Sequence, residues 1–126
     1  MTKKLFMKKD PKIFLSHILE SIEAIDLYTK KLTKEKFTEN GQAQDAVICR
    51  IQVIGEAVKN LPVDLRKRYP HIHWSKATGM RDVMVHDYFG IDKNIVWKTI
   101  KNDLPIFYKE IKKVYNELGG QEKLIK

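Results

Sequence analysis

The side chains best suited to chemistry in this 126-residue chain lie in one stretch, Met80–Gly90, which reads MRDVMVHDYFG. Arg81 keeps its charge at any physiological pH and can hold a phosphate through two N–H donors. His86 can transfer a proton near neutral pH. These two groups are the minimum needed to cleave an RNA phosphodiester without a metal ion. An ordinary structural helix end accounts for the same residues equally well.

The spacing within this stretch predicts which side chains meet if it is helical. At about 100° per residue, Asp82 and His86 face each other one turn apart, so the carboxylate can fix the imidazole tautomer and stabilise its charged form. Arg81 and Tyr88 lie about 20° apart on another face, whereas Arg81 and His86 diverge by about 140°. An ideal helix therefore does not place the arginine beside the histidine.

Two other histidines, His71 and His73, have a spacing that could suggest metal ligands. They lie between Pro70 and Trp74 with no cysteine or carboxylate beside them, which is weak support for a metal site. We therefore predict no metal. The single cysteine, Cys49, lies in an apolar helical pattern. We expect a small packed residue, in a chain that fits a reducing cytoplasm.

Arg50 lies beside the apolar stripe of a long predicted helix, where an unpaired guanidinium would be costly. We expect it to pair with a carboxylate such as Asp45 or Glu56, and a buried ion pair is favoured over a contact with substrate. Gly55, next to Glu56, is typical of a close-packing glycine beside a solvated acid. The roles of Arg50 and Glu56 in any reaction stay open.

The elements that must position these groups are all helical. Apolar residues recur at three- and four-residue spacing, and no alternating strand pattern is present. The pattern predicts a single all-α domain, a bundle of four or five helices with its core in about residues 10–118 and flexible ends at 1–9 and 119–126. Wide apolar stripes favour a homodimer. The expected helices are 11 to about 32 after the cap Asp10, 34–39 after Thr33, 42–61, a turn at 63–69, 74–89 ended by Gly90, one from Asp92, and 102–118.

The composition narrows the partners. The net charge is +8, with 24 Lys and Arg against 16 Asp and Glu, which favours a polyanion such as RNA. Lysine-rich helix surfaces that serve only solubility account for part of this charge. The first residues lack the apolar core of a signal peptide, and no apolar run is long enough to span a membrane. We expect a cytoplasmic protein without a membrane partner.

The motif stretch is similar to the R-x-x-x-x-H-x-Y motif of the HepT-like HEPN proteins, the toxins of MntA–HepT toxin–antitoxin systems. Arg81, His86 and Tyr88 occupy the three motif positions, and Asp82 is a polar residue directly after the arginine, as that family favours. Flanking blocks resemble the family too, so the likeness covers about residues 10–118. The blocks are FLSHILESIEAIDLYTKKLTKEKF, QDAVICRIQVIGEAVKNLP and WSKATGMRDVMVHDYFGIDKNIVWKTIKNDLP.

The resemblance implies an all-α HEPN domain that forms a homodimer, with the two motifs meeting in a shared cleft. Arg81 and His86 then need not be neighbours on one helix, because each active site would be composite. The implied activity is that of a metal-independent endoribonuclease. His86 would act as general acid or base around 2′-hydroxyl attack, Arg81 would steady the pentavalent phosphate, and Asp82 would orient one of them.

The resemblance also implies a protein partner, a minimal nucleotidyltransferase antitoxin of the MntA type. In similar systems this partner transfers AMP from ATP onto the motif tyrosine, here Tyr88, and thereby silences the nuclease. The ATP would be used by the partner, so no cofactor is expected in this chain. The alternative function is a non-catalytic HEPN module that binds the nucleotidyltransferase, a nucleotide, or both. RNA cleavage that depends on His86 distinguishes the two functions.

Overall fold

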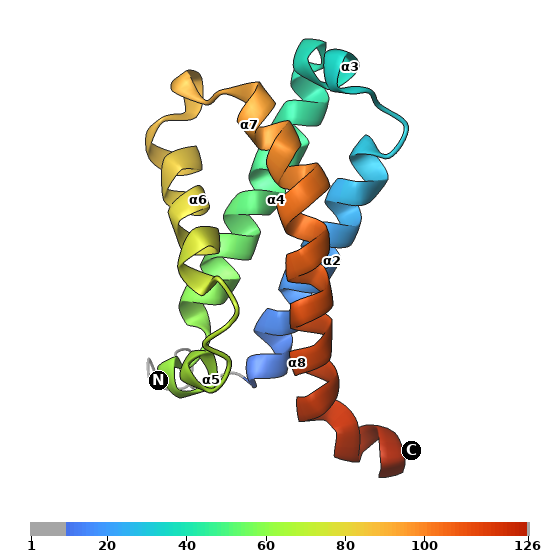
Figure 1. The fold of residues 1–126 in the computed structure, drawn as a ribbon, viewed down its shortest axis with the longest axis vertical. Helices are drawn as coiled ribbons and strands as arrows, with labels where there is room; N and C mark the ends of the chain where they lie inside the picture. Colours follow the sequence, from blue (N-terminus) through green and yellow to red (C-terminus); the bar gives the residue numbers. More distant parts are fainter. Residues whose placement is uncertain (1–9, 126) are drawn as a thin grey trace, which may run out of the picture.

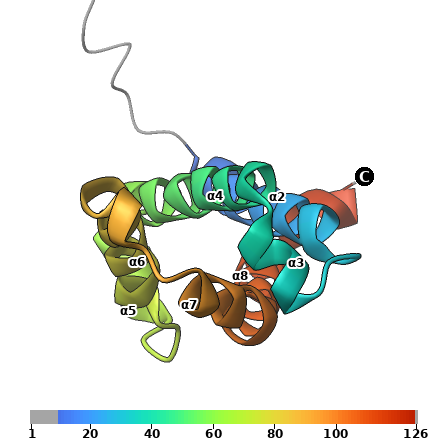
Figure 2. The ribbon, with the colours of Figure 1, turned by 90° about the horizontal axis from the view of Figure 1, so that it is seen from above.

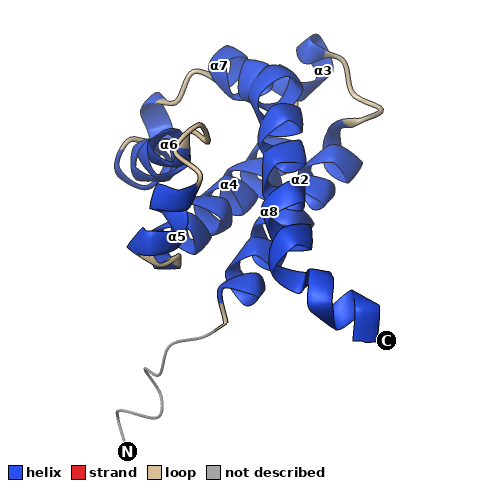
Figure 3. Ribbon diagram, turned by 60° about the horizontal axis from the view of Figure 1, so that its bottom comes forward, coloured by secondary structure: helices blue, strands red, loops and turns tan. Residues whose placement is uncertain are grey.

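Four long helices build the molecule, as the computed structural model shows for the backbone of residues 10–125 and the side chains of residues 10–119 (Figure 1). No strand occurs in that part of the chain (Figure 3), so the predicted all-α class is confirmed. The long helices are α2 (Pro11–Thr29), α4 (Gly41–Asn60), α6 (Trp74–His86) and α8 (Leu104–Ile125). The short elements are α3 (Lys34–Glu39), α5 (Val63–Arg68), the 3₁₀ turn η1 (Tyr88–Gly90), α7 (Lys93–Lys98) and the π turn η2 (Thr99–Asp103).

The helices begin where their capping residues predict. The carboxylate of Asp10 accepts a hydrogen bond from the Lys12 amide at 2.9 Å, and Pro11 occupies the first helical position of α2. Thr33 and Asp92 cap α3 and α7 in the same way. Each cap satisfies a backbone N–H that the helix leaves unpaired. These helix starts are set by local chemistry, and the predictions for them are confirmed.

Helix α4 makes the most extensive contacts of the four long helices. It contacts α2 along one side and α6 along another, while α8 packs against α2. Figure 2 shows these long helices arranged around a common centre. Their apolar stripes fill it with fully buried side chains, among them Leu15, Ile18, Val47, Val58 and Ile111. Helix α6 makes only sparse contacts with α2 and α8. Its position is therefore set by its packing against α4.

The predicted end of α6 at Phe89 is wrong. The helix ends at His86, and Asp87 leaves the helical region with φ −135° and ψ 42°. Gly90 has no positive φ, so it closes the 3₁₀ turn η1 instead of capping a helix. The side-chain carboxylate of Asp87 lies where a Cβ of Gly90 would be, within 2.6 Å of that position. A side chain at position 90 would therefore require only the flexible carboxylate of Asp87 to shift, because the backbone of Gly90 is not strained.

The last helix also differs from the prediction at both ends. The π turn η2 joins α7 to α8, so the two helices predicted from Asp92 and over 102–118 form one continuous helical segment. Pro105 follows this turn and provides the reason, because proline lacks an N–H and its ring clashes with the carbonyl four residues earlier. The helical backbone continues beyond Leu118, through Gly119, to Ile125.

Cys49 is a further correction, since it lies exposed on α4 instead of packing in the core. No helix in the described range 10–125 is both long and apolar enough to cross a membrane.

Candidate active site

Arg81 packs directly against Gly55 of α4. A Cβ built on Gly55 of α4 would lie 2.1 Å from the Cβ of Arg81 and 2.7 Å from its Cγ. Real atoms do not approach so closely, so only glycine lets α6 pack against α4 at this point. The prediction that Gly55 is a close-packing glycine is confirmed, and the side chain it accommodates is the motif arginine.

The guanidinium of Arg81 is held by two carboxylates. Its Nη2 lies 2.5 Å from Oε2 of Glu56, and its Nη1 donates to Oδ1 of Asp82 at 3.0 Å. The hydrogen bond to Asp82, together with the charge of Glu56, raises the pKa of Arg81, so the group stays fully charged. The side chain is 22% exposed, and its Nε is buried without a partner among the described residues. Arg81 is thus held by two ion pairs in a largely buried position.

The expected partners of Arg50 are bound elsewhere. Glu56 pairs with Arg81, and Asp45 accepts a hydrogen bond from Tyr88, so the predicted ion pair of Arg50 with either acid is wrong. The sequence pattern predicts Glu56 only as a solvated acid and misses its ion pair with Arg81. The close-packing signal of the glycine beside it was the available hint, because a glycine contact brings the next residue of α4 to the same seam.

Asp82 does not serve His86. The predicted pair one turn apart is replaced by the bond from Arg81 to Asp82, and Asp82 orients the arginine. His86 is the last residue of α6 and is exposed. It makes no hydrogen bond or ion pair with any residue of the described part of the chain. The structure therefore brings Asp82 to Arg81 and leaves His86 apart from both.

Tyr88 lies in η1 and not on α6, so the predicted shared face with Arg81 is wrong. Its hydroxyl donates a hydrogen bond to Oδ1 of Asp45 on α4. This bond is the main cause that raises the pKa of Tyr88, with smaller contributions from desolvation and the negative charge of Asp45. Asp45 and Glu56 are eleven residues apart, which places them about 20° apart on α4 and about 16 Å apart along its axis. One stripe of α4 therefore holds both Arg81 and Tyr88.

Apolar side chains surround the motif on the outside of the molecule. Met84 is buried, but Val83 and Val85 are about half exposed. Phe89 is 98% exposed and stacks edge-to-face on Tyr88, with ring centroids 5.3 Å apart. Exposed apolar side chains in one region are typical of a surface that contacts another protein.

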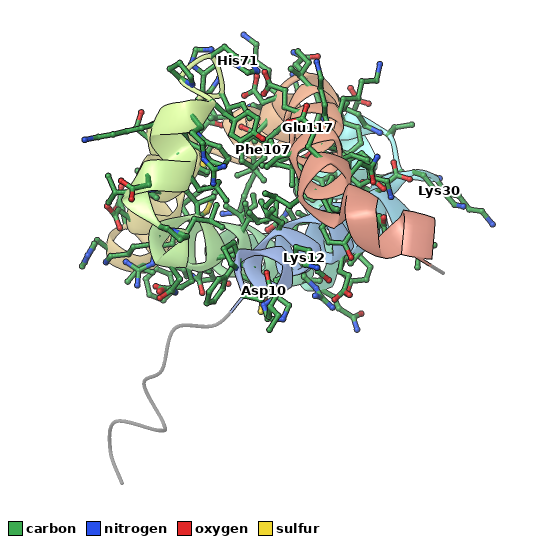
Figure 4. The ribbon with its side chains drawn as sticks, turned by 90° about the horizontal axis from the view of Figure 1, so that it is seen from below. Asp10, Lys12, Lys30, His71, Phe107 and Glu117 are labelled. Atoms are coloured by element: carbon green, nitrogen blue, oxygen red, sulfur yellow. The ribbon has the colours of Figure 1, made fainter. Side chains whose placement is uncertain are left out.

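A cavity of about 330 Å³ lies between α4, α6 and α8, and none of the motif residues Arg81, His86 and Tyr88 lines it. Phe107, one of its lining residues, points inward from α8, while His71 lies at the periphery (Figure 4). His71 and His73 are both exposed. Within the described residues, no three His, Cys, Asp or Glu side chains are grouped so that they could hold a metal ion.

The chain matches a family model over residues 18–114, a range that contains Arg81, His86, Tyr88 and both carboxylates of α4. The model is that of the Ribonuclease HepT-like proteins. The chain belongs to the HepT-like family. It is accordingly an all-α HEPN protein of the ribonuclease type. No solved structure gave a significant match.

Three relatives illustrate the similarity. A gamma-glutamylcyclotransferase and putative RNase of Methanocaldococcus jannaschii is 49% identical over 89% of this chain, which spans only half of that protein. A second protein of that organism with the same RNase designation is 42% identical over 91% of this chain and 95% of its own length. A probable ribonuclease HepT of Thermococcus cleftensis is 41% identical over 79% of this chain and 90% of its own. The HepT-like domain thus occurs both nearly alone and within a longer chain.

Proposed function

We propose that the chain is a metal-independent endoribonuclease that cleaves RNA in the cytoplasm as the toxin of a type VII toxin–antitoxin system. The observation that carries this proposal is the contrast between two residues of α6: Arg81 is fixed by Glu56 and Asp82, whereas His86, five residues further along, is exposed and has no partner among the described residues. A fixed arginine suits a phosphate clamp, and a solvent-facing imidazole suits proton transfer. The family match supports the same activity.

The reaction needs no group from outside the protein except the RNA. A ribose 2′-hydroxyl attacks the adjacent phosphorus, a base takes its proton, and the 5′-oxygen leaves with a proton from an acid. His86 serves as one of these two proton carriers. Arg81 stabilises the additional negative charge of the pentavalent phosphate. Because Glu56 and Asp82 already hold the guanidinium, the phosphate meets a donor set that does not have to be organised during the reaction.

The working site is composite in this proposal, with Arg81 from one protomer and His86 from the other. The two residues diverge by about 140° on the helix, and His86 has no partner within its own described chain. The exposed Val83, Val85 and Phe89 beside the motif supply an apolar surface for the second copy. The net charge of +8 favours RNA over an uncharged ligand.

Silencing in this proposal acts on Tyr88. A minimal nucleotidyltransferase antitoxin of the MntA type transfers AMP from ATP onto its hydroxyl. Tyr88 supports this role by its exposure and by its place two residues beyond His86. An AMP group there adds a phosphate and a purine at the end of α6, where they obstruct access of RNA to the motif.

The experiment is an RNA cleavage assay in the presence of EDTA with wild-type protein and His86→Ala. Removal of a positioned proton carrier lowers rates by about 10²–10⁴-fold, so the variant should be inactive while wild type cleaves. Because His86 is exposed, the variant should keep the wild-type melting curve. Equal cleavage by both proteins would contradict the catalytic assignment.

A second candidate function rests on the same ion pairs. Both ends of the Arg81 guanidinium are already occupied by carboxylates, as expected if the arginine only joins α6 to α4. The chain would then be a non-catalytic module that binds the nucleotidyltransferase, a nucleotide, or both. This candidate predicts a stable complex with the partner and no cleavage of RNA, so cleavage that depends on His86 excludes it.

A further inference from the structure

Three tyrosines in the described part of the chain donate their hydroxyl to a carboxylate. Tyr69 bonds to Glu117, Tyr108 bonds to Glu23, and Tyr88 bonds to Asp45. The pairs of Tyr69 and Tyr108 involve half-buried rings that tie α8 to its neighbours. Tyr88 is exposed and belongs to the motif, and its acceptor comes from a different helix. The hydrogen bond between Tyr88 and Asp45 is therefore made by an exposed tyrosine that a partner protein can reach.

We propose that Asp45 is the proton acceptor for the adenylylation of Tyr88, which means that this chain supplies its own base for the reaction that silences it. The inference rests on the proposed transfer of AMP to Tyr88. In that step the phenolic oxygen attacks the α-phosphorus of ATP and forms a new O–P bond. The bond from that phosphorus to the pyrophosphate oxygen breaks, pyrophosphate leaves with the electron pair, and the phenolic proton passes to the carboxylate of Asp45.

The geometry supports this role directly. A neutral phenol is a weak nucleophile, and a tyrosine with the ordinary pKa of about 10 is already neutral at physiological pH. The hydrogen bond to Asp45 raises the pKa of Tyr88 further. The hydroxyl must therefore lose its proton as it attacks. The carboxylate already accepts that proton's hydrogen bond, which also points the oxygen. Protein kinases use the same arrangement for phosphoryl transfer, in which an aspartate carboxylate accepts a hydrogen bond from the attacking hydroxyl.

Modification would also release the turn. The modified oxygen carries no hydrogen, so it cannot donate to Asp45. The new phosphodiester is an anion beside that carboxylate, and like charges repel. The turn η1 is then no longer tied to α4 by this bond, and the AMP group is directed away from Asp45.

The test is the rate of AMP incorporation, followed by intact mass, with the proposed MntA-type nucleotidyltransferase, ATP and Mg²⁺. Wild type is compared with Asp45→Asn, which keeps an oxygen acceptor for the hydrogen bond but cannot take a proton. At saturating ATP and partner the rate should fall by about 100-fold or more, with little change in the concentrations that saturate it. Asp45→Glu should recover part of the rate, because it restores a carboxylate.

Glu23→Gln is the matched control, since it alters the same kind of tyrosine–carboxylate pair at Tyr108, outside the motif. It should be modified at the wild-type rate, and melting curves should show every variant fully folded at the assay temperature. Modification of Asp45→Asn at the wild-type rate would overturn the role of Asp45 while leaving the modification itself established. A wild-type chain that is not modified at all would overturn the proposed silencing, and the inference with it.

Discussion

Arg81 and His86 lie on the same helix, five residues apart, and their surroundings are opposite. Arg81 packs against Gly55, is bound by Glu56 and Asp82, and is largely buried. His86 ends the helix, is exposed, and is not bound by the described chain. Under the proposed function, this chain organises the phosphate-binding half of the motif and leaves the proton-transfer half without a partner among the described residues. The proposed composite site, completed by a second copy, predicts this asymmetry.

The largest change to this comparison should come from Gly55→Ala. The new methyl group would overlap the Cβ of Arg81 and lie 3.1 Å from the carbonyl of Ala77. Both contacts involve atoms at or next to the backbone, so α6 has to move away from α4. Overpacking of this kind costs about 1–3 kcal/mol. RNA cleavage should fall together with the melting temperature, because Arg81 loses its fixed position relative to Glu56.

Gly79→Ala is the control for that substitution. Gly79 lies in α6 itself, and nothing approaches within 4 Å of where its Cβ would be. Alanine is favoured over glycine inside a helix by about 1 kcal/mol, so this variant should be slightly more stable than wild type and equally active. A Gly55→Ala protein with wild-type stability and RNA cleavage would show that close packing against Gly55 does not position Arg81.

A smaller effect concerns Tyr88, the third motif residue, which is held by α4 as Arg81 is. Its pKa is raised by the hydrogen bond to Asp45. Asp45→Asn should bring the pKa of Tyr88 back toward the ordinary value of about 10, which NMR of labelled tyrosine rings measures. The pKa of Tyr108, bonded to Glu23, should not change.

The sign of the accompanying pH effect follows from that direction. A raised pKa means that the bond favours the neutral phenol, so its contribution to stability is complete below about pH 10 and is lost as the pH rises through the folded-state value. Any difference in melting temperature between wild type and Asp45→Asn should therefore shrink at strongly alkaline pH. A Tyr88 that titrates identically in both proteins would contradict the bond.

The sequence predicted those features that local chemistry determines. Asp10, Thr33 and Asp92 cap helices as expected, because a cap involves only residues two or three positions apart. The end of α6 was mispredicted because Gly90 is a strong stop signal, whereas the chain leaves the helix at Asp87, a residue without such a signal. A helical wheel extended to Phe89 therefore assigns Tyr88 to a face of α6, although Tyr88 lies beyond the end of that helix.

Partners of the motif residues were harder to predict. Arg81 and Glu56 are far apart in sequence, and periodicity offered Asp45 and Glu56 to Arg50 instead. Which cation a carboxylate meets depends on the rotation of α6 against α4, and this is fixed by packing at Gly55. The spacing of residues along the sequence does not predict how far α6 is rotated relative to α4.

The composite site is tested most directly by mixing the two halves. Arg81→Ala and His86→Ala chains with different tags are assembled, and dimers that carry both tags are isolated. If each site takes Arg81 from one copy and His86 from the other, one of the two sites in such a dimer is intact. The mixed dimer should then cleave RNA at about half the wild-type rate, although each parent is inactive. A mixed dimer as inactive as its parents would contradict the composite site.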